Sequence, residues 1–312
     1  MLTICNIRGI LGVVKLPNFS EFERLVLSFF RHGTTFSFNG KTYCVINAGK
    51  PVCASGEPKT DIYVLAKSED GEKIEVKISY KMQNADFIEN KTNEERAEQL
   101  LGPDWKTHII DATKSIKEKF DDRHLIYKKR FAHTAAGSIT LGWKFELVNK
   151  QGGELSGKMD LTAEQVYAVY SGNNLPDNKK NSSVNGEIIA NSGVADYILI
   201  SDDVASADDV VSKMQPLDKY IEEHPDIYFA CKALNYRTYQ AKYDGNRPLA
   251  VQVDWKIKSG KLSPDLIFDE PLTKKGDEMA NNLKNTLAKL SIENTEQINK
   301  DNADLSKCKI YE

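Results

Sequence analysis

Two strand-like runs in the first third of the chain carry charged side chains at alternate positions. Asp61 opens the run at residues 61–66, and Glu75 and Lys77 lie in the run at residues 74–79. Alternate residues of a β-strand point to the same face of the sheet, and the intervening positions here are apolar. Two carboxylates and an ammonium on one face could bind a divalent cation, because Mg²⁺ takes oxygen ligands. Taken alone, the same alternation is more often a set of ion pairs on a solvated strand.

The turn between these runs decides which face Asp61 occupies. A two-residue turn at residues 70–71 would place Asp61 and Glu75 on opposite faces, so no shared metal site could form. A three-residue loop with Gly71 in the left-handed conformation would bring Asp61 to the face of Glu75. Any remaining offset would require a β-bulge or a local twist. A shared site therefore requires irregular hairpin geometry.

The complete pattern is more specific than the alternation alone. The stretch "GEPKTD" at residues 56–61, followed by Glu75-x-Lys77, resembles the active-site signature of the PD-(D/E)XK nuclease superfamily, in the version found in some type II restriction endonucleases. The resemblance implies an α/β (α+β) fold with a restriction-endonuclease-like core, in which helices flank a central mixed sheet. It places an α-β-β-β-α core at residues 18–120 and implies a β-rich C-terminal extension.

The resemblance also implies a role for each residue of the signature. Asp61 and Glu75 would hold Mg²⁺, together with the main-chain carbonyl of Val76. Lys77 would position the attacking water or stabilise the transition state. A cation is needed in such a reaction because the phosphodiester is anionic and repels hydroxide.

Helical periodicity predicts the first element at residues 18–31, where apolar residues form one stripe bordered by Glu23. In several members of the superfamily the first helix supplies another acid, so Glu23 is a candidate metal ligand. Glu57 is a weaker candidate, because it could simply cap a turn. Asn39-Gly40 predicts a hairpin. Further helices are predicted at residues 84–101, 104–120, 162–171 and 277–292, and further strands at residues 34–38, 41–48, 138–149, 157–161, 196–201, 226–243 and 249–258.

The polar, loop-like stretch at residues 172–187 is the strongest break between the two halves of the chain. For the whole chain we predict a nuclease core at residues 1–135 and a DNA-recognition or dimerisation region at residues 136–312, unless both are integrated in one domain. The apolar N-terminal stretch is interrupted by Arg8 and lacks a cleavage site, which favours a strand over a signal peptide.

A basic and aromatic stretch at residues 228–261 predicts a DNA-binding surface. A solvated strand edge protected by lysines accounts for the same residues equally well. In the predicted hairpin loop "KYDGNRP", Asn246 and Arg247 could read base edges. Residues 123–130 are also basic. The candidate DNA contacts are Lys59, Lys81, Gln83, Asn84, Tyr236, Arg237, Asn246 and Arg247.

Composition argues against several other functions. The net charge of −3 limits any nucleic-acid surface to a local patch. The scattered cysteines form no Cys-x-x-Cys pair and the histidines no metal-binding pair, which argues against a disulfide framework and a zinc site. No apolar run is long enough for a membrane span. The sequence contains no P-loop motif, so we expect no nucleotide cofactor. We expect a soluble, cytoplasmic protein encoded by a bacterium or a phage.

The leading hypothesis is a Mg²⁺-dependent double-stranded DNA endonuclease of restriction type. One alternative is a phage or mobile-element DNA nuclease with looser specificity. The other is a non-catalytic DNA-binding protein on a nuclease-like core. Because one constellation cuts one strand, cleavage of both strands at a palindromic site predicts a homodimer on DNA.

Overall fold

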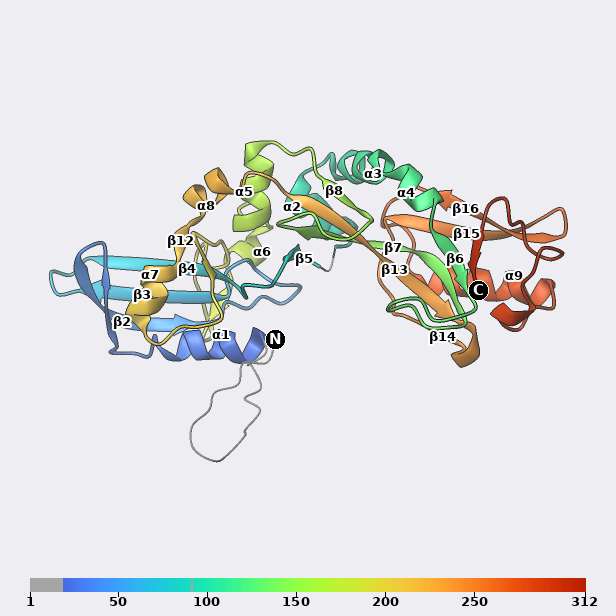
Figure 1. The fold of residues 1–312 in the computed structure, drawn as a ribbon. Helices are drawn as coiled ribbons and strands as arrows, with labels where there is room; N and C mark the ends of the chain where they lie inside the picture. Colours follow the sequence, from blue (N-terminus) through green and yellow to red (C-terminus); the bar gives the residue numbers. More distant parts are fainter. Residues whose placement is uncertain (1–18, 91) are drawn as a thin grey trace, which may run out of the picture. The chain divides into compact units, whose positions relative to one another are not determined.

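The chain folds into two compact units (Figure 1). The computed structural model describes residues 19–90 and 92–312. The strand predicted at the N-terminus therefore lies outside the described residues. Among the residues that are described, no helix is long and apolar enough to cross a membrane.

Each unit is assembled from two separate segments of the chain. The first unit ends at Ala85 and resumes with Tyr170–Glu222, and the second comprises Asp86–Val169 and Glu223–Glu312. The predicted boundary after residue 135 does not coincide with this division. The strands on either side of that position, β6 (His124–Tyr127) and β7 (Ser138–Val148), pair with each other in one sheet.

A six-stranded sheet forms the centre of the first unit, in the order β1-β2-β3-β4-β11-β12. Its neighbours are antiparallel except β4 and β11, which are parallel, so the sheet is mixed. The chain crosses between the units after Ala85, within α5 (Ala163–Ser171) and within α8 (Leu217–Glu223). The other elements of this unit are α1 (Phe19–Ser28), β1 (Thr35–Phe38), β2 (Lys41–Gly49), β3 (Ile62–Ser68), β4 (Lys73–Lys81), α6 (Asp177–Lys180), β9 (Ser183–Val184), β10 (Glu187–Ile188), β11 (Tyr197–Ile200), α7 (Ala207–Lys213) and β12 (Gln215–Pro216).

Residues with positive φ close both hairpins of the antiparallel part. Asn39 (φ 49°) and Gly40 (φ 79°) form the predicted turn between β1 and β2. The β3–β4 hairpin closes with a hydrogen bond from the Ser68 amide to the Glu72 carbonyl, and Gly71 adopts a φ of 94°. The predicted three-residue loop, with Gly71 in the left-handed region, is therefore present.

One face of this sheet packs on α1 and α7 through an apolar core. Ile62 of β3 and Ile78 of β4 are fully buried and share this core with Phe22 of α1. Tyr80 of β4 stacks on both Phe19 and Phe22, with ring centroids 5.2 Å apart in each pair. The apolar stripe that predicts α1 is thus the surface that docks the helix on the sheet.

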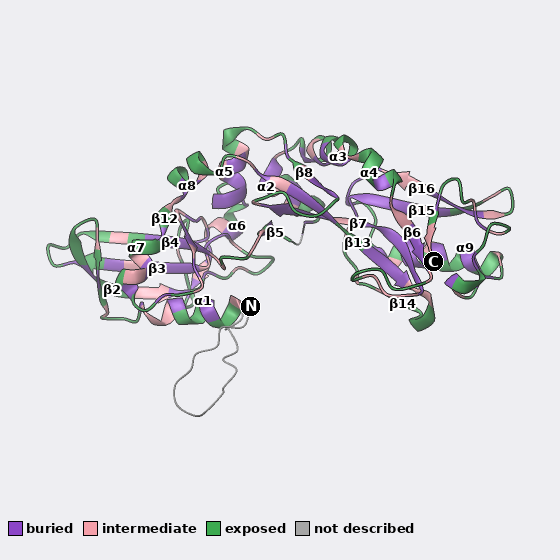
Figure 2. Cartoon of the chain, in the orientation of Figure 1, coloured by how far each residue is buried: buried purple, intermediate pink, exposed green. Residues whose placement is uncertain are grey.

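The second unit is built on a larger sheet whose main path runs β14-β13-β7-β15-β16. Figure 2 shows β7, β13 and β15 as largely buried strands. The elements of this unit are β5 (Phe87–Glu89), α2 (Glu94–Leu101), α3 (Trp105–Ser115), α4 (Lys117–Asp121), β6 (His124–Tyr127), β7 (Ser138–Val148), β8 (Ser156–Lys158), β13 (Tyr228–Arg237), η1 (Thr238–Gln240), β14 (Lys242–Tyr243), β15 (Val251–Lys258), β16 (Lys261–Ile267), α9 (Gly276–Lys289), η2 (Thr295–Gln297) and β17 (Lys309–Tyr311).

Large aromatic side chains fill the core of this second unit. Phe145 and Phe229 stack across β7 and β13 with ring centroids 5.4 Å apart, and Trp255 of β15 is fully buried. Gly142 allows β7 and β15 to approach each other, because a Cβ atom there would lie 2.4 Å from the Val251 carbonyl oxygen. The β-rich C-terminal half is therefore part of this sheet together with residues that precede it.

The structure corrects one predicted element clearly. The helix expected at residues 84–101 begins only at Glu94, and Phe87–Glu89 forms β5. Phe87 pairs with Val148 of β7, so pairing with a buried strand overrides the local helical pattern. The helix expected at residues 104–120 is present as two helices, α3 and α4.

Candidate metal and phosphate site around Asp61

Asp61 lies directly before β3, at a β-bulge. Ile62 stands opposite Ile78 in the β3–β4 ladder, yet the Asp61 amide also donates to the Ile78 carbonyl (2.9 Å). Two successive residues therefore face one residue of β4, which defines a bulge. The extra residue reverses the alternation of faces, so Asp61 lies on the face of Ile62 rather than that of Lys77. There its carboxylate accepts a hydrogen bond from the Tyr80 amide (2.8 Å).

A segment far along the chain holds the backbone in this position. The Lys59 and Thr60 amides both donate to the Gly193 carbonyl, at 2.9 and 3.2 Å. Gly193 admits no side chain, because a Cβ atom there would lie 2.0 Å from the Lys179 carbonyl oxygen and 2.9 Å from Pro58. A tertiary contact therefore holds the backbone that leads into the bulge at Asp61.

Glu23 of α1 is the second acid at this site. Glu23 is 6% exposed, and both of its carboxylate oxygens contact the Lys50 ammonium, at 2.8 and 2.9 Å. Burial raises the pKa of Glu23, the hydrogen bond and charge of Lys50 lower it in part, and the neighbouring Asp61 charge raises it. Lys50 therefore compensates the charge of the Glu23 carboxylate.

Lysines also surround Asp61. Asp61 is partly accessible to solvent, but the dense protein around its carboxylate raises its pKa through desolvation. Lys81, Lys50 and Lys59 act in the opposite direction through their charges, as does the hydrogen bond from the Tyr80 amide. Two acids within a local excess of ammonium groups are suited to binding a cation and an anionic group together.

A cavity of about 140 Å³ opens beside these groups. Lys50, Glu57, Thr60 and Asp61 are among the residues that line it. The Thr60 hydroxyl is buried and has no hydrogen-bond partner within the described part of the chain. Because most buried hydroxyls in proteins are hydrogen-bonded, an unsatisfied one beside a cavity marks a position where a ligand or water would be stabilised.

Glu75 and Lys77 lie on the other face of the hairpin, away from Asp61. Tyr63 stands opposite Lys77 in the ladder, and its hydroxyl donates to Glu75 Oε1 (2.7 Å). Lys77 is 9% exposed, and its ammonium pairs with Asp196 (3.1 Å). The structure therefore does not bring Asp61, Glu75 and Lys77 together, because the bulge cancels the effect of the three-residue loop.

The Val76 carbonyl, a further predicted metal ligand, is equally remote from this site. Val76 stands opposite Val64 inside the β3–β4 ladder, and its side chain is fully buried in the core of the first unit. Of the predicted metal ligands, Asp61 and Glu23 are linked through Lys50, which pairs with Glu23 and lines the same cavity as Asp61.

The predicted DNA contacts of the first unit differ in accessibility. Lys59 is 8% exposed, whereas Lys81 is half-buried at the end of β4. Gln83 and Asn84 are exposed just beyond this strand, and the Gln83 amide donates to the Asp202 carboxylate (3.0 Å). Lys81 therefore belongs to the surroundings of Asp61 as well as to this accessible strand end.

The predicted DNA contacts of the second unit are mostly engaged within the protein. Tyr236 is buried, and Arg237 pairs with Asp244 (2.6 Å). The Asn246 side-chain oxygen accepts a hydrogen bond from an amide in the first turn of α9 (3.2 Å). Arg247 is exposed, and its guanidinium contacts no side chain or carbonyl among residues 19–90 and 92–312. It is the member of this group that remains available to a ligand.

Sequence reasoning missed Lys50 and Thr60 as members of the site. Lys50 follows the predicted strand at residues 41–48 and carries no signal of its own, because its contact with Glu23 arises only when α1 packs on the sheet. Thr60 lies within the "GEPKTD" stretch that drew attention to Asp61. The position of Thr60 directly before Asp61 is therefore the one signal that the sequence offers for it.

Comparison with protein-family models, curated proteins and solved structures gives no match to this chain. Within the described residues, no group of three or more His, Cys, Asp or Glu side chains is arranged to hold a metal ion. A metal at this site would therefore depend on two carboxylates and on groups brought by the substrate.

Proposed function

We propose that this protein is a Mg²⁺-dependent double-stranded DNA endonuclease of restriction type, with its site centred on Asp61 and Glu23. The observation that carries the proposal is the ion pair of Glu23 with Lys50, which lines the same cavity as Asp61, together with the charges of Lys59 and Lys81 that act on Asp61. Hydrolysis of a phosphodiester requires hard oxygen ligands for a cation and positive charge for the phosphate. Both requirements are met at one place.

The donor set fits Mg²⁺ even without a third carboxylate. Magnesium in phosphoryl-transfer sites is usually held by one or two carboxylates, and water and substrate phosphate complete its coordination. Asp61 and Glu23 supply the two carboxylates, and the unsatisfied Thr60 hydroxyl adds an oxygen at the cavity. Bound Mg²⁺ would supply charge neutralisation and a more acidic water.

The lysines would act on the phosphate. Lys81 is half-buried at the accessible end of β4. Its charge lowers the pKa of Asp61 more than the charge of Lys50 or Lys59 does. Its ammonium would bind the scissile phosphate and stabilise the negative charge that develops in the transition state. In this assignment Lys81 takes the role that the resemblance gives to Lys77, and Glu23 takes that of Glu75.

The order of elements in the first unit also supports the proposal. α1 precedes the β2-β3-β4 meander, and β11 pairs parallel to β4. A helix, three antiparallel strands and a covering helix are what the resemblance to the PD-(D/E)XK superfamily implies. The closing elements come from Tyr170–Glu222, whereas residues 86–120 belong to the second unit.

The second candidate function is a non-catalytic DNA-binding protein on a nuclease-like core. The observation that favours it is the double contact of Lys50 with Glu23, because an ammonium there already compensates the acid that a metal would need. This protein would bind DNA through its lysines and through Arg247 without breaking it.

The test is incubation of the protein with supercoiled plasmid and Mg²⁺, followed by sequencing of the ends. We expect linear product from the unaltered protein, and loss of cleavage by at least about 100-fold in Asp61→Asn and Glu23→Gln. Glu75→Gln is the matched control, since it removes an equivalent charge from the other face, and should keep its activity. Ends without a shared sequence would favour the looser-specificity nuclease.

The remaining outcomes separate the alternatives. DNA binding without cleavage in any divalent cation would support the non-catalytic protein, and failure of both would refute the two functions together. The homodimer stays a prediction of this proposal: the mass of the protein–DNA complex should correspond to two chains. A one-to-one complex that yields only nicked plasmid would contradict the dimer while leaving the site in place.

A further inference from the structure

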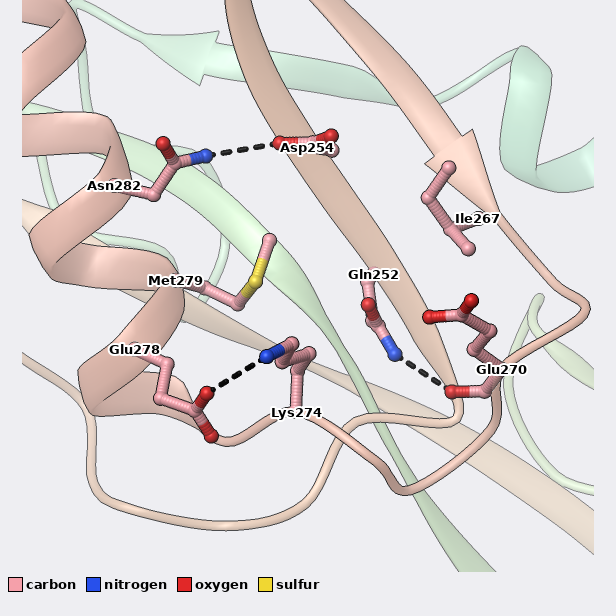
Figure 3. A pocket seen from close by; sticks show the side chains of 8 residues that line it. All are labelled: Gln252, Asp254, Ile267, Glu270, Lys274, Glu278, Met279 and Asn282. Atoms are coloured by element: carbon pink, nitrogen blue, oxygen red, sulfur yellow. Dashed lines mark hydrogen bonds and ion pairs between the residues drawn. The ribbon is translucent and has the colours of Figure 1, made fainter.

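A second cavity, of about 470 Å³, lies in the second unit between the β15–β16 hairpin and α9 (Figure 3). A volume of this size is typical of sites for small organic ligands. The polar residues that line it are Gln252 and Asp254 of β15, Glu270 and Lys274 of the loop after β16, and Glu278 and Asn282 of α9.

Gln252 is fixed so that it offers only an acceptor to this cavity. It is 4% exposed, and its Nε2 donates to the Glu270 carbonyl (2.6 Å) and to the Thr273 hydroxyl oxygen (3.0 Å). Both amide hydrogens are therefore used, and the orientation of the amide is set. Its Oε1 receives no hydrogen bond from any described residue. An acceptor held in a fixed orientation at a cavity offers a hydrogen-bonding position to a ligand.

Asn282 on the facing helix is fixed in the same way. Its Nδ2 donates to Asp254 Oδ1 (2.9 Å) and to the Trp255 carbonyl (3.3 Å), which leaves its own oxygen as an acceptor. The remaining donor of the cavity, the Lys274 ammonium, pairs with Glu278 (3.0 Å). The side-chain donors of the lining are therefore committed to the protein, whereas the amide oxygens of Gln252 and Asn282 remain open.

The charge of the lining points in the same direction. Two of the three lining carboxylates are paired within the protein, Asp254 with Lys256 (2.8 Å) and Glu278 with Lys274 (3.0 Å), and the exposed Glu270 carboxylate contacts no other described residue. The unpaired carboxylate of Glu270 makes the cavity unfavourable for a phosphate. Met279, which is 6% exposed, and Ile267 supply an apolar wall. The complementary ligand is a cation with several N–H donors and an aliphatic part.

We propose that this cavity binds a small aliphatic amine or guanidine. Its cationic ends would donate to the Glu270 carboxylate and to the open oxygens of Gln252 and Asn282, and its methylene chain would lie against Met279. Hydrogen bonds between a charged donor and a carboxylate are the strongest of those available here. This inference does not depend on the proposed nuclease function, since the cavity and the Asp61 site lie in different units.

The test is calorimetric titration of the full-length protein with agmatine, which carries a guanidinium and an amine on a four-carbon chain. We expect saturable binding, absent with butane-1,4-diol, which keeps the chain and lacks the charges. Glu270→Gln should weaken binding about tenfold, because a charge-assisted hydrogen bond is replaced by a neutral one. Glu293→Gln, which neutralises another exposed carboxylate of the same unit, should bind as the unaltered protein does.

A second measurement makes the site assignment independent of folding losses in a variant. In the unaltered protein, agmatine should shift the side-chain amide resonances of Gln252 and Asn282, identified by their loss in Gln252→Glu and Asn282→Asp. A capped tripeptide with a central arginine tests whether the same cation can come from a side chain. No saturation by either cation up to about 10 mM, or equal binding by Glu270→Gln, would overturn the proposal.

Discussion

The two faces of the β3–β4 hairpin use the same residue types in opposite ways. On the face away from α1, Glu75 accepts from Tyr63 and Lys77 pairs with Asp196, so each charge has a partner within the protein. On the face of α1, the carboxylate of Asp61 lies beside a second acid, several lysines and a cavity. Charges that satisfy one another stabilise a fold, whereas acids held together beside open space remain available for a ligand.

The sharpest test of this contrast compares Lys81 with Lys77. Lys81→Met should lower Mg²⁺-dependent cleavage by about 100-fold or more, because the ammonium that stabilises the developing charge is removed. Lys77→Met should keep the cleavage rate and lower the melting temperature instead, because Asp196 loses its partner. Plasmid cleavage and thermal unfolding, measured on both variants, give the answer. The reverse pattern would move the chemistry to the face of Glu75.

The pH dependence of stability tests the burial of Asp61. Its pKa in the folded protein is raised by desolvation, so between its ordinary pKa of about 4 and the folded value the native state binds more protons than the unfolded state. The contribution of Asp61 to the free energy of unfolding therefore falls as the pH rises through that window. In the presence of EDTA, Asp61→Asn should be about 1–3 kcal/mol more stable at pH 8, and the gain should disappear toward pH 4.

Asp70→Asn serves as the control of opposite sign for that experiment. Hydrogen bonds from Ser68 and Lys41 lower the pKa of Asp70, so its charged form contributes stability at neutral pH and loses it as the pH falls through its folded pKa. Asp70→Asn should accordingly lose stability at pH 8. Urea unfolding at a series of pH values measures both variants, and a destabilised Asp61→Asn at pH 8 would show that Asp61 is not strained by burial.

The contact of Lys50 with Glu23 predicts competition with a metal. Because the Lys50 ammonium occupies both carboxylate oxygens, Lys50→Met should bind Mg²⁺ or Mn²⁺ about tenfold more tightly at pH 8. Lys41→Met is the matched control, since Lys41 also bridges two acids, Asp70 and Glu72, in the same unit. Calorimetric titration would settle the point, and an unchanged affinity in Lys50→Met would remove Glu23 from the metal set.

The smallest expected effect concerns the face of the β3–β4 hairpin that carries Glu75 and Lys77. Tyr63→Phe removes one hydrogen bond to Glu75 and should lower the free energy of unfolding by about 1 kcal/mol. Cleavage should be unaffected. Chemical unfolding of the variant measures the change, and a loss of cleavage without a loss of stability would indicate that this face takes part in the reaction.

Local signals in the sequence predicted much of the first unit. The apolar stripe predicted α1, Asn39-Gly40 the β1–β2 turn, and Gly71 the loop of the next hairpin. The face of Asp61 could not be predicted, because it depends on amides held by the Gly193 carbonyl, and no local pattern encodes that contact. The sequence therefore predicts Asp61 on the face of Glu75 and Lys77, whereas the structure places it on the opposite face of the hairpin.

The division into units was unpredictable for a related reason. Phe87 and its neighbours carry a helical pattern, and only pairing with β7 makes them a strand of the second unit. The polar stretch at residues 172–187 predicts a break between two halves of the chain, yet it lies inside Tyr170–Glu222, the second segment of the first unit. The composition of a segment indicates whether it is exposed to solvent, but it does not indicate which distant strand the segment pairs with.

The parallel pairing of β4 with β11 joins Ile78 to Tyr197, and the whole first segment of the second unit lies between them in the chain. On the ribosome, β1 to β4 emerge long before β11, so the outer edge of β4 stays unpaired while that segment is made. An unpaired strand edge is a template for other chains, and pairing between distant residues is slow. The nascent protein is therefore most exposed to aggregation, and most dependent on chaperones, in the interval before β11 leaves the exit tunnel.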